Sequence, residues 1–514
     1  MPQMRYNRAA GAQAGAHTDE ADSHVCKEQV TVAQQGVTPQ SEDFSRWYTD
    51  VVQKADLADY SPVRGCMIIK PYGYELWEAV KAGLDRRFKE TGHKNAYFPL
   101  FIPESFLKKE AEHVEGFSPE LAVVTIGGGK PLEEPLVVRP TSETIIGWAF
   151  QKWIQSYRDL PLLINQWANV VRWELRTRLF LRTMEFLWQE GHTAHATHED
   201  ALAETMRMLG VYTDFAVNDA AIPVIPGRKS NQERFAGAVA SYSIEAMMRD
   251  GKALQAGTSH DLGQNFAKAF EIQFTDENND LQYCWTTSWG VSTRMVGAIV
   301  MAHGDDQGLR LPPKLAPIQV VIVPIFREES QRASVMAAAA RIKAMLHEAG
   351  LRVHLDDRDN FSPGYKFNDW EMRGVPLRLE IGPKDVANHT VALARRDMPG
   401  KEGKRFVSQD GLVGTVRDLL DDIQASLLRQ ATEFRDSHLH EVTSNYQDFI
   451  EVIRGGEWAL AWFCESAACE ERVKEDAQAV SRNFPLEQPH PGEQGKCIIC
   501  GQPAREMAYF AKAY

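Results

Sequence analysis

The sequence lacks several features that would define broad classes of protein. It contains no apolar run of about 18 residues, which a membrane-spanning helix needs, and its first residues lack the apolar segment of a secretory signal. Only seven of its 514 residues are cysteines, too few for a disulfide scaffold, so we expect a protein of the reducing cytoplasm. A basic excess is also missing. The net charge of −13 excludes a general polyanion binder, although local basic faces could still recognise RNA.

What remains is an ordinary globular composition, with 44% hydrophobic and 25% charged residues. A chain of 514 residues is expected to form two to four domains, because single cores stop growing near about 250–300 residues. Residues 1–37 are rich in Ala, Gly, Gln, His and Ser, which predicts a disordered tail. The proline-rich LRLPPKLAP (309–317) is typical of a boundary between domains.

Hydrophobic patterns on the two sides of this boundary differ. Before it, Leu76, Val80, Leu84 and Phe88 form one apolar stripe, which predicts a helix. Further elements are expected there, namely strands near 121–126, 135–139, 161–173 and 180–190 and helices over about 142–157 and 195–210. After the boundary, a buried strand at 319–325, an Ala-rich helix to about 348 and a second strand indicate an α/β unit. A charged helix over about 416–440 leads to the last part of the chain.

Charged residues interrupt the apolar segments between residues 139 and 192. They are Arg139, Glu143, Arg172, Glu174, Arg182 and Glu190, which lie among Val, Phe, Leu and Trp. Charges are rarely placed inside a protein unless they are paired or held for a ligand. Arginines beside carboxylates therefore indicate a site for a phosphate-bearing anion and a cation together. The alternative is a network of buried ion pairs, but a protein rarely buries so much charge for stability alone.

Cysteines gather near the C-terminus in two pairs, Cys464-x4-Cys469 and Cys497-x2-Cys500. Two such turns can present four thiolates tetrahedrally to Zn²⁺, and four protein ligands would make the site structural. The alternative is that they are reduced free thiols, as we expect for Cys26, Cys66 and Cys284. The trio His192, His195 and His198 is a weaker metal candidate, because its spacing drifts off one helical face and no cysteine or carboxylate completes it convincingly.

Longer segments resemble one enzyme family. Three segments resemble motif 2 and its surroundings in the class II aminoacyl-tRNA synthetases, namely RPTSET (139–144), VVRWE (170–174) and FLRTMEFLWQEGH (180–192). Their sequences are similar to those of the prolyl-tRNA synthetases within this class. Further matches to this family are RGCMIIKPYGYELWE (64–78) and TGHKNAYFPLFIP (91–103) for motif 1, LQAGTSHDLGQNF (254–266) for the amino-acid pocket, SWGVSTR (288–294) and HGDDQGLRLPP (303–313) for motif 3, and residues 356–385 for the anticodon-binding domain. The resemblance covers nearly everything from about residue 38 to Tyr514 in the family's order.

The resemblance implies an α+β fold class. A class II catalytic domain, with an antiparallel sheet flanked by helices, would span 38–315. An α/β anticodon-binding domain would follow at 316–425, and a small C-terminal α+β zinc domain at 426–514. The resemblance to motif 1 implies a homodimer. Residues 195–254 match the compact form of the family, so we expect no editing domain in this chain. In this branch of the family the carboxylate of a last residue such as Tyr514 reaches back to the catalytic domain.

The resemblance also assigns roles in catalysis and ATP binding. The reaction is an in-line attack of the proline carboxylate on the α-phosphate of ATP, in which growing charge on phosphate must be neutralised. Arg172, Glu174 and Arg294 are the residues expected to carry catalysis. The expected ATP-binding set consists of Arg172, Glu174, Arg182, Thr183, Gln255, Thr258, Ser292 and Arg294. Mg²⁺ is expected on the phosphates, although no dedicated metal motif marks it.

Proline and tRNA would be bound by two further sets. The proline-binding residues implied by the resemblance are Phe117, Glu120, Thr141, Glu143, Arg172, Trp188 and His260. A small apolar pocket rejects isosteres poorly, so alanine or cysteine should be misactivated and corrected by a separate protein. For the anticodon bases of tRNA(Pro), stacking and hydrogen bonding would come from Lys366, Phe367, Glu371 and Arg378.

Three other interpretations stay open at this point. One is a class II synthetase for another amino acid, such as the threonyl or glycyl type. The sequence of the segments that resemble the proline pocket disfavours it. Another is a synthetase-like regulator that binds tRNA or an amino acid without catalysis. Such paralogues lose a motif arginine or the anticodon domain, whereas this chain keeps Arg172 and Arg294. A third is an additional role for the N-terminal tail, on which the sequence is silent.

Overall fold

The structure, a computed structural model, describes residues 36–113, 121–174 and 176–514. Almost all of the predicted tail therefore lies outside the described residues, as do Phe117 and Glu120. Residues Val37–Tyr514 form one compact unit.

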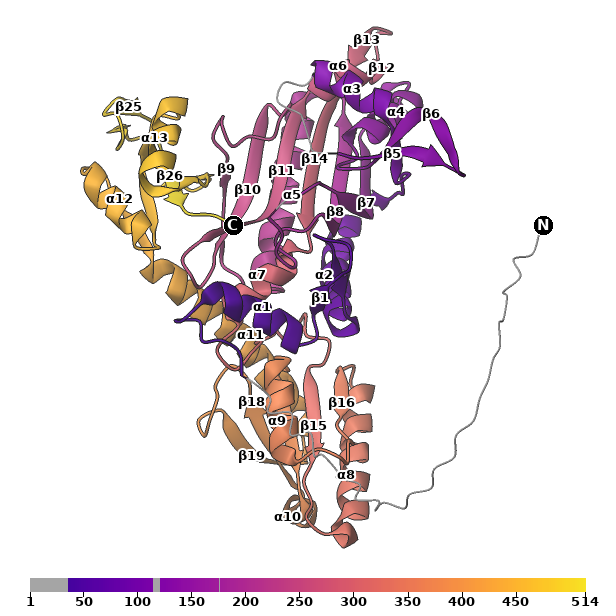
Figure 1. Cartoon of the computed structure of the whole chain (residues 1–514), viewed down its shortest axis with the longest axis vertical. Coiled ribbons are helices and arrows are strands. Elements are labelled where there is room, and N and C mark those ends of the chain that lie inside the picture. Colours follow the sequence, from indigo (N-terminus) through magenta and orange to yellow (C-terminus); the bar gives the residue numbers. More distant parts are fainter. Residues whose placement is uncertain (1–35, 114–120, 175) are drawn as a thin grey trace, which may run out of the picture. The chain divides into compact units, whose positions relative to one another are not determined.

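An eight-stranded sheet organises the first part of the chain, in the order β23-β9-β10-β11-β14-β8-β7-β3 (Figure 1). All neighbours are antiparallel except β3 and β7. The strands are β3 (Lys94–Asn95), β7 (Leu162–Val171), β8 (Glu185–His195), β9 (Val224–Arg228), β10 (Ala240–Met247), β11 (Ala253–Gly263), β14 (Trp285–Ser292) and β23 (Phe484–Pro485). The edge strand β23 comes from the far end of the chain, so C-terminal residues complete this sheet.

Alternate residues of the central strands point to opposite faces, as the strand repeat of two requires. On one face Gln189 of β8 accepts a hydrogen bond from Tyr212 of α5 (His198–Asn218), with 2.7 Å between the oxygens. Trp289 of β14 packs against Tyr212 and against Phe88 of α2 (Pro71–Glu90) on the same face. This face carries the main hydrophobic core, which helices α5, α2 and α7 (Arg294–His303) cover. The other face is left for polar side chains.

Smaller elements surround the large sheet. They include a three-stranded sheet in the order β4-β6-β5. The remaining elements of this part are α1 (Phe44–Lys54), β1 (Ala58–Tyr60), β2 (Met67–Ile69), β4 (Phe101–Pro103), α3 (Glu104–His113), β5 (Ala122–Gly127), β6 (Lys130–Val138), α4 (Glu143–Trp153), α6 (Asn265–Phe270), β12 (Gln273–Thr275) and β13 (Leu281–Tyr283). A second cluster of buried apolar residues lies beneath α4 and α6.

A five-stranded sheet with its own core follows the proline-rich segment, in the order β16-β15-β17-β18-β19. Its strand–helix–strand start is parallel, as expected for an α/β unit. The elements are β15 (Val320–Pro324), α8 (Glu329–Glu348), β16 (Val353–Leu355), α9 (Pro363–Met372), β17 (Leu377–Ile381), α10 (Pro383–Asn388), β18 (Thr390–Arg395), β19 (Lys404–Ser408) and α11 (Leu412–Ser437).

The C-terminal part forms a four-stranded sheet, in the order β20-β21-β26-β22, over a third core. Its elements are β20 (Leu439–Glu441), α12 (Tyr446–Arg454), β21 (Trp458–Phe463), α13 (Ala467–Ala477), β22 (Val480–Ser481), β24 (Gly495–Lys496), β25 (Pro503–Ala504) and β26 (Glu506–Ala511). No helix among the described residues is both long enough and apolar enough to cross a membrane.

Two helices have boundaries that differ from the sequence prediction. The helix predicted over 142–157 ends at Trp153, because Ile154 turns into extended backbone and buries its side chain. The helix predicted over 195–210 begins only at His198 and continues to Asn218. Strand β8 extends to His195, and the Thr197 side chain then caps the helix by accepting from the Asp200 N–H.

Candidate active site

A cavity of about 280 Å³ opens on the polar face of the eight-stranded sheet. Alternation on three neighbouring strands builds its floor, so side chains two apart lie side by side. The floor residues are Phe186, Trp188, Glu190 and His192 of β8, Gln255, Thr258 and His260 of β11, and Ser288, Gly290 and Ser292 of β14. Thr141, Glu143, Arg172 and Arg294 reach the cavity from flanking segments.

Carboxylates gather on one side of the cavity. Glu143, the first residue of α4, is buried and accepts a hydrogen bond from the Thr141 hydroxyl. Glu190 is buried beside Ser142, which donates to its carboxylate over 2.5 Å, and beside His192 at 3.1 Å. Burial alone would raise the pKa of Glu190, but the hydrogen bonds from His192, Ser142 and Gln166 lower it. Burial alone would lower the pKa of His192, but the hydrogen bond to Glu190 and the negative charge of Glu190 raise it.

Arg172 extends into the cavity from the residue after β7. Its Nε donates to the Pro140 carbonyl over 2.9 Å, and its guanidinium lies 5.5 Å and 5.3 Å from the ring centres of Phe186 and Trp188. Desolvation lowers the pKa of Arg172, while Glu143 and Glu190 act against this shift. The side chain remains exposed to the solvent of the cavity, so it keeps its charge. Its remaining donors are free to receive an anion.

Arg294 begins α7 and supplies a second cationic group. Its Nε donates to the Leu181 carbonyl over 3.1 Å, and its backbone N–H donates to the Ser292 hydroxyl. Desolvation and the positive charges of Arg172 and Arg182 lower its pKa to about 10, so the guanidinium is still charged at neutral pH. Positive charge thus lies opposite the carboxylates, and the cavity matches a ligand with an ammonium group at one end and phosphate at the other.

A less polar wall closes the cavity on a third side. The ring of His260 lies 4.8 Å from that of Phe235, and its Nδ1 lies 2.8 Å from the Ser241 hydroxyl oxygen. Desolvation, helped by the charges of His192 and Lys229, lowers the pKa of His260 to about 3. His260 is therefore a neutral wall group at physiological pH. It does not serve as a charged ligand for an anion.

Three predicted residues lie beside the cavity and do not line it. Glu174 and Arg182 belong to the segment between β7 and β8, where Arg182 Nε lies 3.0 Å from a Glu174 carboxylate oxygen. The Arg182 side chain is 56% exposed and therefore free to move toward a bound ligand. Thr183 is buried, and its hydroxyl donates to the Glu185 carbonyl over 2.7 Å.

The structure also brings to the cavity Phe186, Glu190, His192, Lys229, Glu233, Phe235 and Ser241, of which only Glu190 was among the charged residues that the sequence indicated for the site. A signal for the first three was present, since they alternate with Trp188 on one strand. The loop between β9 and β10 carries Lys229, Glu233 and Phe235. No sequence pattern within this loop predicts that it lies beside the cavity. The guanidinium of Arg139, in contrast, donates to the Phe98 carbonyl and to the carbonyl and side chain of Asn169, which indicates a structural role.

The predicted tRNA-binding residues meet on the five-stranded sheet, with one exception. The Arg378 guanidinium lies 4.0 Å from the centre of the Phe367 ring and pairs with Glu371 over 2.6 Å. Lys366 lies apart from them, because its buried ammonium donates to the Asp356 carbonyl over 3.0 Å. Phe367, Glu371 and Arg378 thus form one composite surface, whereas Lys366 braces the fold behind it.

The four C-terminal cysteines come together as the spacing predicted. All four sulfurs lie within 4.8 Å of one another, and Cys464 lies 3.7 Å from Cys469 and 3.6 Å from Cys500. Tetrahedral Zn²⁺ with Zn–S bonds of about 2.3 Å separates its sulfurs by about 3.8 Å, so the cluster fits that ion. Cys66 and Cys284 are free thiols elsewhere in the described chain.

Comparisons with known proteins agree with this geometry. Models of the class II tRNA synthetase core domain (G, H, P, S and T), the anticodon-binding domain and the prolyl-tRNA synthetase C-terminal domain match residues 125–303, 319–419 and 446–514. The chain is 59% identical over 481 residues to a chloroplastic/mitochondrial proline–tRNA ligase of Arabidopsis thaliana, covering 93% of this chain and 88% of that protein. It is 57% identical to a proline–tRNA ligase of Roseiflexus castenholzii, covering 93% and 99%. A prolyl-tRNA synthetase structure from Cryptosporidium parvum, complexed with halofuginone and AMPPNP, has a TM-score of 0.89 and 38% identity, covering 93% of this chain and 99% of that one.

Proposed function

This chain belongs to the prolyl-tRNA synthetases, and we propose that the cavity on its eight-stranded sheet is where it activates proline. Members of this family are ATP-dependent ligases, and so is this protein. It joins L-proline to AMP with release of pyrophosphate, and then transfers proline to the 3′ end of tRNA(Pro). What we propose concerns the residues that do this, the domain limits, the metals and the assembly.

One observation carries the assignment of the cavity, namely its separation of charge. The carboxylates of Glu143 and Glu190 act on Arg172, while Arg294 adds positive charge beside Ser292, which lies opposite Trp188 and therefore two positions along β8 from Glu190. In the reaction a carboxylate oxygen of proline bonds to the α-phosphorus of ATP as the bond to the bridging oxygen breaks. Arg172 would bind both the proline carboxylate and the α-phosphate, which brings the two reactants into line and neutralises the growing charge. This geometry requires no nucleophilic or general-base side chain.

The nucleotide would extend from Arg172 toward the mouth of the cavity. Arg294 would bind the γ-phosphate end, and the exposed Arg182 would join it from the loop, with Thr183 holding that loop in place. Gln255, Thr258 and Ser292 offer hydrogen bonds along the floor, and Glu174 would take the adenine end. Mg²⁺ would accompany the phosphates, where it would neutralise part of their charge.

Proline would lie at the acidic side. Its secondary ammonium needs acceptors, which Thr141 and Glu143 supply, and its ring needs an apolar wall, which Trp188 and the neutral His260 supply. Phe235 extends that wall beside His260. Phe117 and Glu120 remain candidates for the same subsite, although they lie outside the described residues.

The rest of the chain would serve tRNA and structure. We place the catalytic domain at 38–315, the anticodon-binding domain at 316–425 and the zinc domain at 426–514, in line with three separate cores. The Phe367–Glu371–Arg378 surface would stack on and hydrogen-bond the anticodon bases. Cys464, Cys469, Cys497 and Cys500 would hold Zn²⁺, whose binding contributes folding free energy.

A homodimer is the assembly that we propose, and a cytoplasmic compartment is the location. Large apolar side chains are exposed around the three-stranded sheet and α4, which would be costly on a monomer. They include Tyr97, Phe101, Ile126, Trp148 and Trp153, with exposed fractions of 73%, 44%, 63%, 43% and 49%. Sedimentation equilibrium should therefore give twice the chain mass of 57.9 kDa.

The test of the proposed function is ATP–pyrophosphate exchange by the purified chain with each of the twenty amino acids. Proline should give the strongest exchange, with weaker signals from alanine and cysteine. Strongest exchange with another amino acid would change the substrate of the cavity. No exchange from a folded protein that still binds tRNA(Pro) would favour a tRNA-binding regulator instead.

A further inference from the structure

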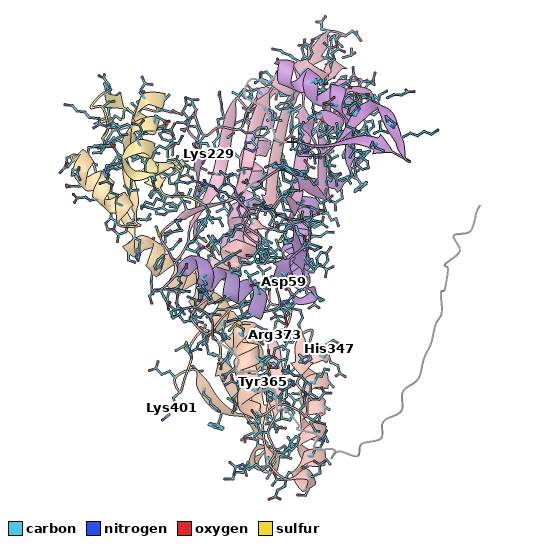
Figure 2. The ribbon with its side chains drawn as sticks, viewed as in Figure 1. Asp59, Lys229, His347, Tyr365, Arg373 and Lys401 are labelled. Atoms are coloured by element: carbon cyan, nitrogen blue, oxygen red, sulfur yellow. The ribbon has the colours of Figure 1, made fainter. Side chains whose placement is uncertain are left out.

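The loop between β9 and β10 forms part of the cavity wall without regular structure of its own. Lys229, Glu233 and Phe235 all line the cavity from this loop. Figure 2 shows Lys229 between the large sheet and the C-terminal part of the chain. Within its own part of the chain, the loop is tied by the Phe235 N–H, which donates to the Ser241 hydroxyl over 3.0 Å. Several polar contacts of its first half lead instead to the C-terminal part of the chain.

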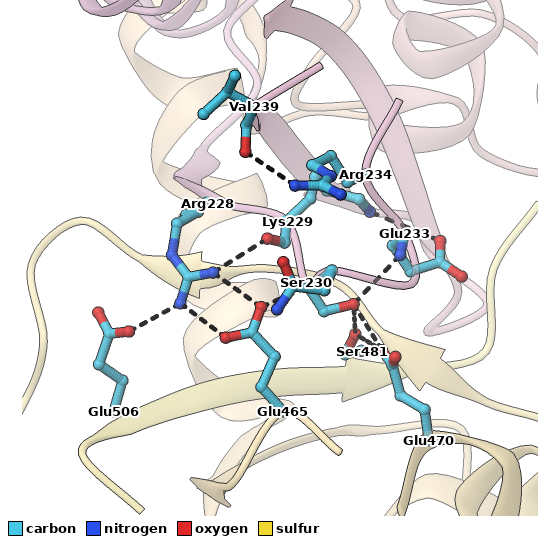
Figure 3. Close-up of polar contacts among 11 residues, drawn as sticks. Arg228, Lys229, Ser230, Glu233, Arg234, Val239, Glu465, Glu470, Ser481 and Glu506 are labelled. Carbon is cyan, nitrogen blue, oxygen red and sulfur yellow. Dashed lines mark hydrogen bonds and ion pairs between the residues drawn. The ribbon is translucent and has the colours of Figure 1, made fainter. Parts of the chain in front are cut away.

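Glu465, the residue after Cys464, holds the first half of the loop (Figure 3). Its carboxylate accepts two hydrogen bonds from the Arg228 guanidinium, over 2.9 and 3.3 Å, and one from the Asn231 N–H over 2.9 Å. The other edge of the Arg228 guanidinium donates to Glu506 over 2.8 Å. The face of the guanidinium lies 4.4 Å from the centre of the Phe484 ring. Such a two-pronged pair fixes orientation as well as distance.

Glu470, the residue after Cys469, holds the loop at a second point. It lies on α13 and is buried, and it accepts from the Ser230 hydroxyl over 2.7 Å and from the Ser481 hydroxyl. The Ser230 oxygen in turn accepts from the Glu233 N–H over 3.3 Å. Figure 3 shows this chain of contacts from Glu470 through Ser230 to the cavity residue Glu233.

The backbone reinforces both contacts. Strand β23 adds to the sheet beside β9, with Phe484 opposite Arg228. The Arg482 carbonyl accepts from the Lys229 ammonium over 2.8 Å. The Arg482 guanidinium reaches Glu245 over 2.7 Å, and Glu245 is the β10 partner of the cavity residue Gln255. C-terminal residues therefore set the position of several cavity residues.

We propose that the four-cysteine cluster is a positioning device for the proline site: Glu465 and Glu470, each one residue from a cluster cysteine, hold the loop that places Lys229, Glu233 and Phe235. This rests on the proposed function, since it takes the cavity as the proline site and Zn²⁺ as the occupant of the cluster. A simpler interpretation would give these contacts only the role of attaching the C-terminal domain. That role would affect stability alone, whereas positioning must affect the affinity for proline.

The test compares variants on both sides of the junction. Arg228→Leu combined with Ser230→Ala removes the side-chain contacts to Glu465 and Glu470 without touching a cysteine or its neighbours, and leaves the Asn231 N–H contact to Glu465. Cys497→Ser removes one metal ligand far along the sequence from the loop. The matched control is Glu471→Gln, since Glu471 is the exposed neighbour of Glu470 on α13 and pairs only with the exposed Lys474. Measurements are zinc content, hydrogen exchange of residues 229–236, and KM and kcat for proline in pyrophosphate exchange.

Positioning predicts faster hydrogen exchange of 229–236 and a KM for proline about tenfold higher with kcat nearly unchanged, because ground and transition states lose the same contacts. The loop double variant and zinc-depleted Cys497→Ser should both show the faster exchange and the higher KM. Glu471→Gln should match the unaltered chain in both measurements. An unchanged exchange rate and KM in the folded double variant would overturn the proposal. An unchanged exchange rate of 229–236 and an unchanged KM for proline in a folded, zinc-free Cys497→Ser protein would also overturn the proposal, because the cluster would then not position the loop. If Cys497→Ser does not fold, chelator treatment of the unaltered chain gives the same comparison.

Hydrogen exchange of the loop is read without any substrate. A chain that fails to activate proline at all would refute the proposed function, and the loop measurement would still decide whether the cluster positions it.

Discussion

Arginines in the cavity and arginines on the five-stranded sheet are held in opposite ways. Neither Arg172 nor Arg294 forms an ion pair with a carboxylate among the described residues, and each donates its Nε to a backbone carbonyl. On the five-stranded sheet, Arg378 pairs with Glu371 and Glu380, while Arg358 pairs with Asp356 and Asp369. The guanidinium charges of Arg172 and Arg294 are not neutralised by a paired carboxylate, whereas those of Arg358 and Arg378 are.

The difference separates two uses of the same side chain. An unpaired guanidinium in a partly desolvated cavity costs folding free energy, so it indicates a ligand whose negative charge completes it. A guanidinium already held by carboxylates contributes shape and a stacking surface. The cavity is thus suited to phosphate, while the Phe367–Glu371–Arg378 surface is suited to bases. This division agrees with a chain whose net charge of −13 offers no general attraction to RNA.

The largest expected effect comes from Arg172→Ala. The rate of proline-dependent pyrophosphate exchange should fall about a thousandfold, because a charge directed at the reacting phosphate is lost. The midpoint of thermal unfolding should hardly change, since no ion pair breaks. A fall of less than tenfold would mean that the unpaired charge serves another purpose.

Arg139→Ala provides the contrast within the same segment. This residue is buried and its donors are satisfied by Phe98 and Asn169. Its loss should lower the free energy of unfolding by about 3 kcal/mol, because buried acceptors lose their donors. The residual folded protein should keep its affinity for ATP. Denaturant titration together with ATP binding would separate the two roles.

Mild acid should weaken the catalytic core before it weakens the five-stranded sheet. Burial lowers the pKa values of His195 and His303 to about 4, so the unfolded chain takes up these protons first as the pH falls below about 6.5. At pH 5.5 each histidine should cost about 1.4 kcal/mol of stability. His192 adds no slope in this window, because its raised pKa means that its gain is complete by about pH 6.5.

Asp356, which is paired beside the five-stranded sheet, loses stability with the same sign as the pH falls, but only over a lower pH range. Hydrogen bonds from Arg358 and Trp370 outweigh burial and lower its pKa to about 2, so its contribution persists until strong acid. Hydrogen exchange at pH 7 and pH 5.5 should therefore show greater loss of protection around β8 and α7 than in β15 and β17. Equal loss in both would contradict the comparison.

The smallest effect is expected from Arg378→Ala. The KM for tRNA(Pro) in aminoacylation should rise about tenfold through loss of stacking and of the hold on Glu371, and proline-dependent exchange without tRNA should stay unchanged. Glu402→Gln, an exposed change in the turn before β19, is a suitable control. A loss of pyrophosphate exchange in Arg378→Ala would show that the two regions are not separable.

Local pattern predicted elements of the fold, and the resemblance to the family named most of the site residues that the structure brings together. Thr141, Glu143, Arg172, Trp188, Gln255, Thr258, His260, Ser292 and Arg294 all line one cavity. The pattern Cys464-x4-Cys469 and Cys497-x2-Cys500 gathers as expected. Helix ends were displaced where β8 ran on to His195, because strand pairing extends a strand beyond what its own residues indicate.

The parts that were missed depend on long-range contact. Strand β23 completes a sheet whose other strands all end by Ser292, and no pattern within Phe484–Pro485 indicates this pairing. Lys229 reaches the cavity because Arg482 and Glu465 hold its loop, which no repeat or spacing near Lys229 encodes. Lys366 has the residue type of an RNA ligand, but Asp356 draws it into the fold.

The central claim is that the unpaired Arg172 and Arg294 mark the phosphate site, whereas the paired Arg378 does not. Calorimetric titration of ATP into the unaltered chain, Arg294→Ala and Arg378→Ala tests it most directly. The account predicts an ATP dissociation constant at least about tenfold higher for Arg294→Ala, equivalent to about 1.4 kcal/mol, and an unchanged one for Arg378→Ala. Equal weakening in both variants, or none in Arg294→Ala, would contradict it.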